Sequence, residues 1–306
     1  STTTMSFSNY NEFEFARELL KKLIKFQIKE GFFEIESKIY SPVLFLESLS
    51  CYFNSLYEFE TIKTEKSNLS ENQNFKKTLK SEIDFFSNNF KRVIEYLRNN
   101  ISSDYILLYN TLNKFEGKVY YALENAVILS FADELSQILN QFNYNKEADF
   151  IFMFKTKIEL GFNRYFYHNS TKKLIYSFKE NCQIIFPNVT QYYKILNKYI
   201  SNKNLLSSYE IETKNNLDFL EQKLLYINLI KANKKQFDLE LKKLKSLIMK
   251  FPKFIWDKDY FETYFELSKS INKDFNITSE ELKSKQVLVD LNSVQTINLV
   301  LNIYSK

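Results

Sequence analysis

Turn-forming residues are scarce in this chain, which has only three glycines and three prolines among its 306 residues. Average usage of these two residue types, roughly 12%, would give about 37. Tight β-hairpin turns are rich in glycine and asparagine, because the backbone of such a turn needs positive φ. A chain with so few glycines and prolines is therefore not built of many hairpins, and helices are the expected elements.

The bulk composition is that of a soluble globular protein, with 44% hydrophobic and 26% charged residues. No stretch between the predicted helices has the Pro/Gly/Ser composition of a linker, so we predict a single all-α domain over residues 1–306. No apolar run approaches the length of a membrane span, and we expect none. The first residues also lack the basic and apolar segments of a signal peptide, which favours the cytoplasm.

Several classes of binding site are not expected, because the residues that they need are few or widely separated. Gly31, Gly117 and Gly161 cannot form one glycine-rich phosphate loop. His168 is the one histidine of the chain, and Cys51 and Cys182 are its two cysteines. We therefore predict no metal site and no cofactor, and we expect both thiols to be buried, reduced and unpaired.

The net charge of +5 comes almost entirely from lysine, since the chain contains four arginines. Base and phosphate recognition favours the bidentate guanidinium of arginine, and no block of Lys and Arg stands out. We therefore do not expect a nucleic-acid partner.

Hydrophobic spacing predicts helices along most of the chain. The first starts at a capping box of Asn9 and Glu12, with Gly31 as its C′ residue. Helix 42–58 is apolar almost all round and should be buried, whereas helix 75–99 carries one apolar stripe. Polar residues 62–74 are predicted to form a surface loop. Further helices are expected at 119–141, 145–167, 188–200, 213–232, 234–250, 258–271, 278–286 and 293–304, with residues 104–118 partly extended and 173–186 extended.

The helices that are apolar on more than one face predict the core. We expect largely buried side chains at six positions in helices 42–58 and 119–141: Leu46, Leu49, Phe53, Ala126, Leu129 and Phe131.

Two segments resemble the helical hairpins of the six-hairpin glycosidases, whose fold is an (α/α)6 toroid. Residues 117–178 read GKVYYALENAVILSFADELSQILNQFNYNKEADFIFMFKTKIELGFNRYFYHNSTKKLIYSF. In this run an apolar helix, a short turn and an amphipathic helix precede an aromatic-rich end and an extended piece. Near the N-terminus, LLKKLIKFQIKEGFF leads into SPVLFLESLSCYF. The resemblance implies an α/α-toroid-like array of antiparallel helical hairpins.

The same resemblance implies a sugar site at the loops that enter the inner helices. Glycoside hydrolysis needs two carboxylates that face each other across a cleft. If helices 42–58 and 119–141 are inner, loops 31–41, 104–118 and 251–257 should share one rim. We place the catalytic carboxylates there at Glu36, Glu116 and Asp257, with Tyr40 and Trp256 as surfaces on which a sugar would stack.

A further polar pair lies in the segment FNRYFYHNS. Arg164 and His168 are four residues apart and should share a helix face. They are candidates for substrate binding, and the alternative is that they pair with the last carbonyls of their helix.

Two functions remain open from the sequence. The first is a carbohydrate-active toroid that hydrolyses or binds an oligosaccharide. The alternative is a non-enzymatic helical interaction or scaffold protein that binds a protein partner in a groove, because no loop joins Gly, Trp and acidic residues as in the toroid enzymes. Facing carboxylates in a cleft would favour the first function, and an exposed apolar patch would favour the second.

Overall fold

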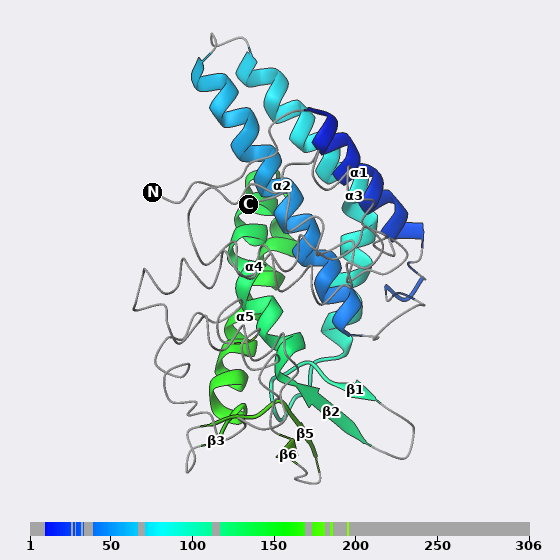
Figure 1. Cartoon of the computed structure of the whole chain (residues 1–306), viewed down its shortest axis with the longest axis vertical. Helices are drawn as coiled ribbons and strands as arrows, with labels where there is room; N and C mark the ends of the chain where they lie inside the picture. The colour runs from blue at the N-terminus through cyan, green and yellow to red at the C-terminus, as the bar shows by residue number, and fades with distance from the viewer. Residues whose placement is uncertain are drawn as a thin grey trace, which may run out of the picture. The chain divides into compact units, whose positions relative to one another are not determined.

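The structure is a computed structural model of the chain. It describes residues 10–25, 27, 29–31, 33, 39–66, 71–111, 117–168, 173–180, 184–185 and 195. The described part is mostly helical, as predicted from the scarcity of glycine and proline (Figure 1). Its helices are α1 (Tyr10–Lys25), α2 (Tyr40–Lys66), α3 (Glu71–Asn99), α4 (Ala122–Gln141) and α5 (Asn145–Tyr165).

Helix α2 lies at the centre of the described helices, in contact with α1, α3 and α4 (Figure 1). All ten residues from 41 to 50 are buried, so this helix has no solvent-facing side over nearly three turns. The prediction that helix 42–58 is buried is confirmed for residues 42–50, whereas farther along Cys51, Asn54 and Tyr57 are half-buried and Glu58 is exposed.

Helices α1 and α3 each bury one stripe. In α3 the predicted apolar stripe is confirmed, because every member is buried: Leu79, Ile83, Phe86, Phe90, Val93 and Leu97. The polar loop predicted at 62–74 is wrong, since α2 continues to Lys66 and α3 already begins at Glu71. The residues there include Glu, Lys and Gln, whose polar side chains suit a surface loop but which also have high helix propensity.

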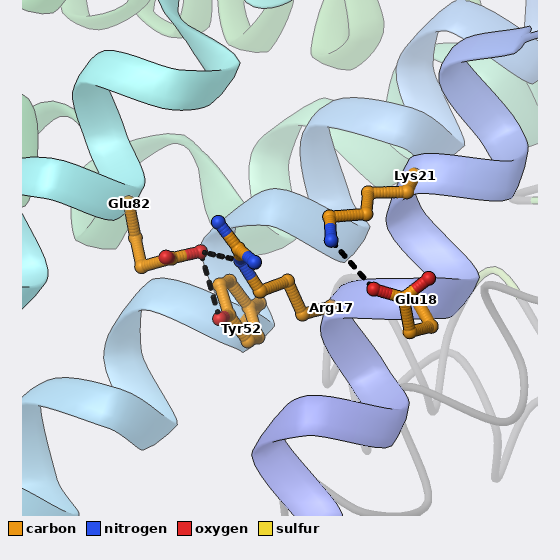
Figure 2. Close-up of polar contacts among 5 residues, drawn as sticks. All are labelled: Arg17, Glu18, Lys21, Tyr52 and Glu82. Atoms are coloured by element: carbon orange, nitrogen blue, oxygen red, sulfur yellow. Dashed lines mark hydrogen bonds and ion pairs between the residues drawn. The ribbon is translucent and has the colours of Figure 1, made fainter.

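A polar cluster joins α1, α2 and α3 where they meet (Figure 2). The Nε of Arg17 donates to the Glu82 carboxylate at 2.8 Å, and the hydroxyl of Tyr52 donates to the same oxygen at 3.1 Å. Burial, with the charge of Glu82, raises the pKa of Tyr52, so this phenol remains a hydrogen-bond donor. Arg17 also lies over the ring of Phe85, at 4.9 Å from its centroid. Each of the three helices thus contributes one side chain to one connected network.

Gly31 has a different role from the predicted helix cap. Helix α1 ends at Lys25, six residues earlier, so Gly31 is not its C′ residue. Its φ is +96°, and an added Cβ would lie 2.3 Å from the carbonyl oxygen of Arg92 on α3. The chain after α1 passes so close to α3 that a side chain at this position would collide with backbone.

The segments predicted to be extended form a small antiparallel sheet beside the helices (Figure 1). Its order is β1 (Asn110–Thr111), β2 (Lys118–Tyr121), β5 (Ser177–Lys179) and β6 (Ile184–Ile185). Strands β3 (Tyr167–His168) and β4 (Lys173–Leu174) form a separate pair. The predicted helix 119–141 begins only at residue 122, because the β-branched and aromatic residues of β2 pair with β5.

Aromatic side chains pack where this sheet meets the helices. Tyr120 of β2 and Phe178 of β5 are register partners, and their rings stack at 4.8 Å. Tyr105 contacts both rings, and Tyr165 at the end of α5 contacts Tyr105. The cluster thus attaches the sheet to the last turn of α5.

The core predictions are confirmed at five of six positions. The exception is Leu129 on α4, which is only half-buried. The buried residues are Leu46, Leu49, Phe53, Ala126 and Phe131.

The single domain predicted over residues 1–306 stays a prediction, since the described residues end at 195. The helices expected at 188–200, 213–232, 234–250, 258–271, 278–286 and 293–304 also lie outside the described residues, apart from Ile195 itself. Cys182 lies outside them as well, so the prediction that the two thiols are unpaired is likewise open, but Cys51 is half-buried and not buried as predicted.

Replacing Phe53 by alanine should lower the free energy of unfolding by roughly 3–5 kcal/mol, because its ring is fully enclosed in the core. Phe152→Ala is a matched control at a position that is 57% exposed, and it should change stability by no more than about 0.5 kcal/mol. Chemical denaturation of both variants measures the difference. A loss below about 1 kcal/mol for Phe53→Ala would show that α2 is not enclosed.

Candidate functional site

Most of the predicted sugar-site residues lie outside the described part of the chain. This holds for the three carboxylates Glu36, Glu116 and Asp257 and for Trp256. Their meeting at one rim therefore stays a prediction. Tyr40 is described as the first residue of α2, where its side chain is half-buried.

Arg164 and His168 do not share a helix face, so that prediction is wrong. Arg164 is exposed in the last turn of α5, and its guanidinium lies 5.2 Å from the ring centroid of Tyr165. Helix α5 ends at Tyr165, and His168 belongs to strand β3, where its backbone pairs with Lys173. The chain leaves the helix there because residues 167–168 pair with the next strand.

A buried carboxylate that the sequence reasoning missed lies at the start of α4. Glu124 stands in the first turn of this helix and is only 6% exposed. The side-chain amide of Asn110, on β1, donates to both carboxylate oxygens, at 2.8 and 2.7 Å. Because β2 runs directly into α4, the antiparallel partner β1 brings Asn110 beside this first turn. The negative charge also lies where the dipole of α4 is positive.

Three tyrosines from different elements lie within the electrostatic reach of Glu124. Burial, and after it the charge of Glu124, raises the pKa of Tyr96 on α3 to about 12. The same two causes, in the same order, raise the pKa of Tyr121 on β2 and that of Tyr176 before β5. The rings of Tyr121 and Tyr176 meet edge to face, with centroids 5.9 Å apart.

The residue after Glu124 is structural. Asn125 is fully buried, and its side-chain oxygen accepts a hydrogen bond from the backbone N–H of Leu108 at 2.9 Å. Its amide donates to the carbonyl of Tyr121 at 2.8 Å. This side chain fixes the segment before β1 against α4, and so holds Asn110 in reach of Glu124.

The Glu124 cluster, meaning Glu124 with Asn110, Tyr96, Tyr121 and Tyr176, combines a carboxylate, an amide and three phenols. Such groups can exchange hydrogen bonds with a polyhydroxyl ligand, and they also join β1 to α4. Its signal in the sequence is the polar pair Glu124–Asn125 inside the apolar run YYALENAVILSF. Polar residues in a helix that is predicted to be buried must find partners within the protein.

A second feature lies on α5. One side of this helix packs on α4 through residues that include Ile151, Phe154 and Ile158. On the other side three large apolar side chains are more than half exposed, at 57, 56 and 63% respectively: Phe152, Met153 and Leu160. We call these three residues, together with exposed Asp149, Thr156, Lys157 and Arg164, the α5 outer face.

Comparison with known proteins adds no assignment. No family model matches the chain, and neither does any curated protein or any solved structure.

Within the described residues no helix is long and apolar enough to cross a membrane. In the same part of the chain, no three His, Cys, Asp or Glu side chains gather so as to hold a metal ion.

The Glu124 cluster predicts a specific response to alkali. The pKa of tyrosine is about 10 in an unfolded chain, and that of Tyr96 is about 12 in the folded protein. The folded protein therefore holds this proton more tightly. The resulting stabilisation is complete below pH 10 and is lost as the pH rises from about 10 through 12.

Glu124→Gln should lower the pKa of Tyr96 while leaving it above about 10, because burial, its main cause, remains. The measurement is a spectroscopic titration of tyrosinate, in which each protein is compared with its Tyr96→Phe counterpart. Glu95→Gln, an exposed neighbour on α3, serves as the control and should leave the titration unchanged. An unaltered pKa of Tyr96 in Glu124→Gln would contradict this account of the cluster.

Proposed function

We propose that this protein is a non-enzymatic helical interaction protein that binds a protein partner through the α5 outer face. The observation that carries the proposal is the exposure of Phe152, Met153 and Leu160 on one side of a helix whose other side is packed. An apolar surface of this kind on a soluble protein is characteristic of interaction sites.

Covering the α5 outer face with a partner would be favourable in free energy. Fully burying a side chain such as Leu, Met or Phe contributes roughly 1.5–3 kcal/mol relative to leaving it exposed. Two such side chains on one turn, with a third about two turns later, would form the apolar centre of an interface. Lys157 and Arg164 on one hand and Asp149 on the other supply a charged rim of both signs, which is the usual surrounding of an interface core.

The exposed face of α3 offers a useful comparison. Among the residues of α3 whose burial is described, 77–99, the large apolar side chain with more than a third exposed is Phe85, and that ring lies beneath the cations of Arg17 and Lys21. Within the described residues, the α5 outer face has several such side chains together. This concentration is what distinguishes α5 as the binding surface.

A photo-reactive residue at position 152 tests the proposal in cells that express the chain naturally. We expect it to form a covalent adduct with a protein partner. Leu160→Glu should abolish the adduct because it places a charge in the same apolar surface, whereas the neighbouring change Glu159→Gln should not. No adduct at position 152, or an adduct that survives Leu160→Glu, would contradict the proposal.

The second candidate is the carbohydrate-active toroid implied by the resemblance to six-hairpin glycosidases. It is supported by the Glu124 cluster, whose carboxylate, amide and phenols are groups that bind sugar hydroxyls. In this proposal Glu36, Glu116 and Asp257 provide the catalytic acid and base, and the ligand is an oligosaccharide.

Calorimetric titration with a panel of neutral oligosaccharides tests the second candidate. A binding sugar should lose about fivefold in affinity in Trp256→Ala, since stacking on an aromatic ring contributes roughly 1 kcal/mol. Phe152→Ala should leave that affinity unchanged. Absence of binding across the panel would eliminate this candidate.

A further inference from the structure

We propose that the partner of the α5 outer face is a second copy of this chain, with the two α5 helices packed antiparallel about a two-fold axis. The inference rests on the proposed function, because it names the partner for the same surface. It follows from the order of the exposed residues along α5.

The exposed residues are arranged so that an antiparallel copy complements them. A contact centred between Thr156 and Lys157 sets Met153 opposite the partner subunit's Leu160. It also sets Asp149 opposite the partner subunit's Arg164. Two-fold symmetry repeats each of these pairs, so the interface has apolar contacts at its centre and an ion pair at each end.

The four residues are suitably placed for this contact. Asp149, Met153, Leu160 and Arg164 are separated by four, seven and four positions, which keeps them on one side of a helix. All four are exposed. The residues that pack on α4 lie on the opposite side, so pairing does not compete with the fold of the subunit.

The charges select the antiparallel direction. The acidic residue of the face lies toward the start of α5 and Arg164 lies in its last turn. A parallel pair in the same register would set Asp149 against the partner's Asp149 and bring like helix ends together. An antiparallel pair instead joins opposite charges and opposes the two helix dipoles, and both effects are favourable.

The interface is small, because each subunit contributes one helix face. Stable protein interfaces bury about 1,200–2,000 Å² in total, and smaller ones belong to weak complexes. We therefore expect a reversible dimer with a dissociation constant on the order of micromolar. Such a dimer would form and dissociate within the concentration range of ordinary solution measurements.

Sedimentation velocity of the purified full chain over a concentration series provides the test. Asp149→Arg alone and Arg164→Asp alone should each weaken dimerisation about tenfold, because each sets like charges opposite one another twice. The double variant Asp149→Arg/Arg164→Asp should recover the dimer by restoring opposite charges. Glu159→Arg makes the same change of charge as Asp149→Arg outside the paired positions, and it should leave the dimer unchanged.

A chain that is monomeric at every concentration would overturn the inference. So would a double variant that dimerises no better than the single ones, because compensation is specific to this pairing. Since all the substituted side chains are exposed, the variants should fold like the parent.

Oxidation of Met153 by dilute peroxide, located by mass spectrometry, separates the failure of this inference from that of the proposed function. The dimer predicts rapid oxidation in dilute solution and protection as the concentration rises. Rapid oxidation at every concentration in a monomeric chain would overturn the dimer and leave a different protein partner for the same face. Protection at every dilution of a monomeric chain would overturn both proposals, because the face would then be covered within the subunit.

Discussion

The burial of the first three turns of α2 on all their sides is the constraint on which the described helices depend. A helix that is apolar nearly all round must be surrounded by other elements, and α1, α3 and α4 provide these neighbours. The buried apolar stripes of α1 and α3 belong to the helices that cover α2. The cluster of Arg17, Tyr52 and Glu82 then adds a polar connection at the place where three helices meet. Apolar burial accounts for the assembly of these helices, and the cluster fixes their mutual positions.

The polar residues of α2 show how such burial is tolerated. Ser48 and Ser50 are fully buried, yet their small side chains allow neighbouring helices to approach closely. The hydroxyl of Ser48 donates to the carbonyl of Leu44 in its own helix, and that of Ser50 donates to the carbonyl of Phe131 on α4. These hydrogen bonds avoid the cost of an unsatisfied polar group, and Ser50 also joins α2 to α4.

The helices could be predicted because the spacing of apolar residues along a helix is visible in a short stretch of sequence. The stripe from Leu79 to Leu97 and the all-round burial of α2 followed directly from the order of apolar residues. The sheet was predicted only as extended segments, since β2 and β5 are nearly sixty residues apart and their pairing has no local signal. The role of Gly31 depends on the approach of α3, and the partner of Glu124 depends on the pairing of β1. Such contacts exist only after distant parts of the chain have come together.

The contrast between Glu124 and α5 explains why the proposed function rests on a surface. Both carboxylate oxygens of Glu124 accept hydrogen bonds from Asn110, and the cluster links β1 to α4, so these contacts have a structural role. Among the described residues no comparable internal role accounts for Phe152, Met153 and Leu160, because their helix is already anchored by its opposite side. Apolar side chains at solvent-facing positions add nothing to the stability of the subunit that polar residues would not also supply. In the proposed function, a second molecule buries these side chains, and that burial is the stabilisation that their exposed positions leave available.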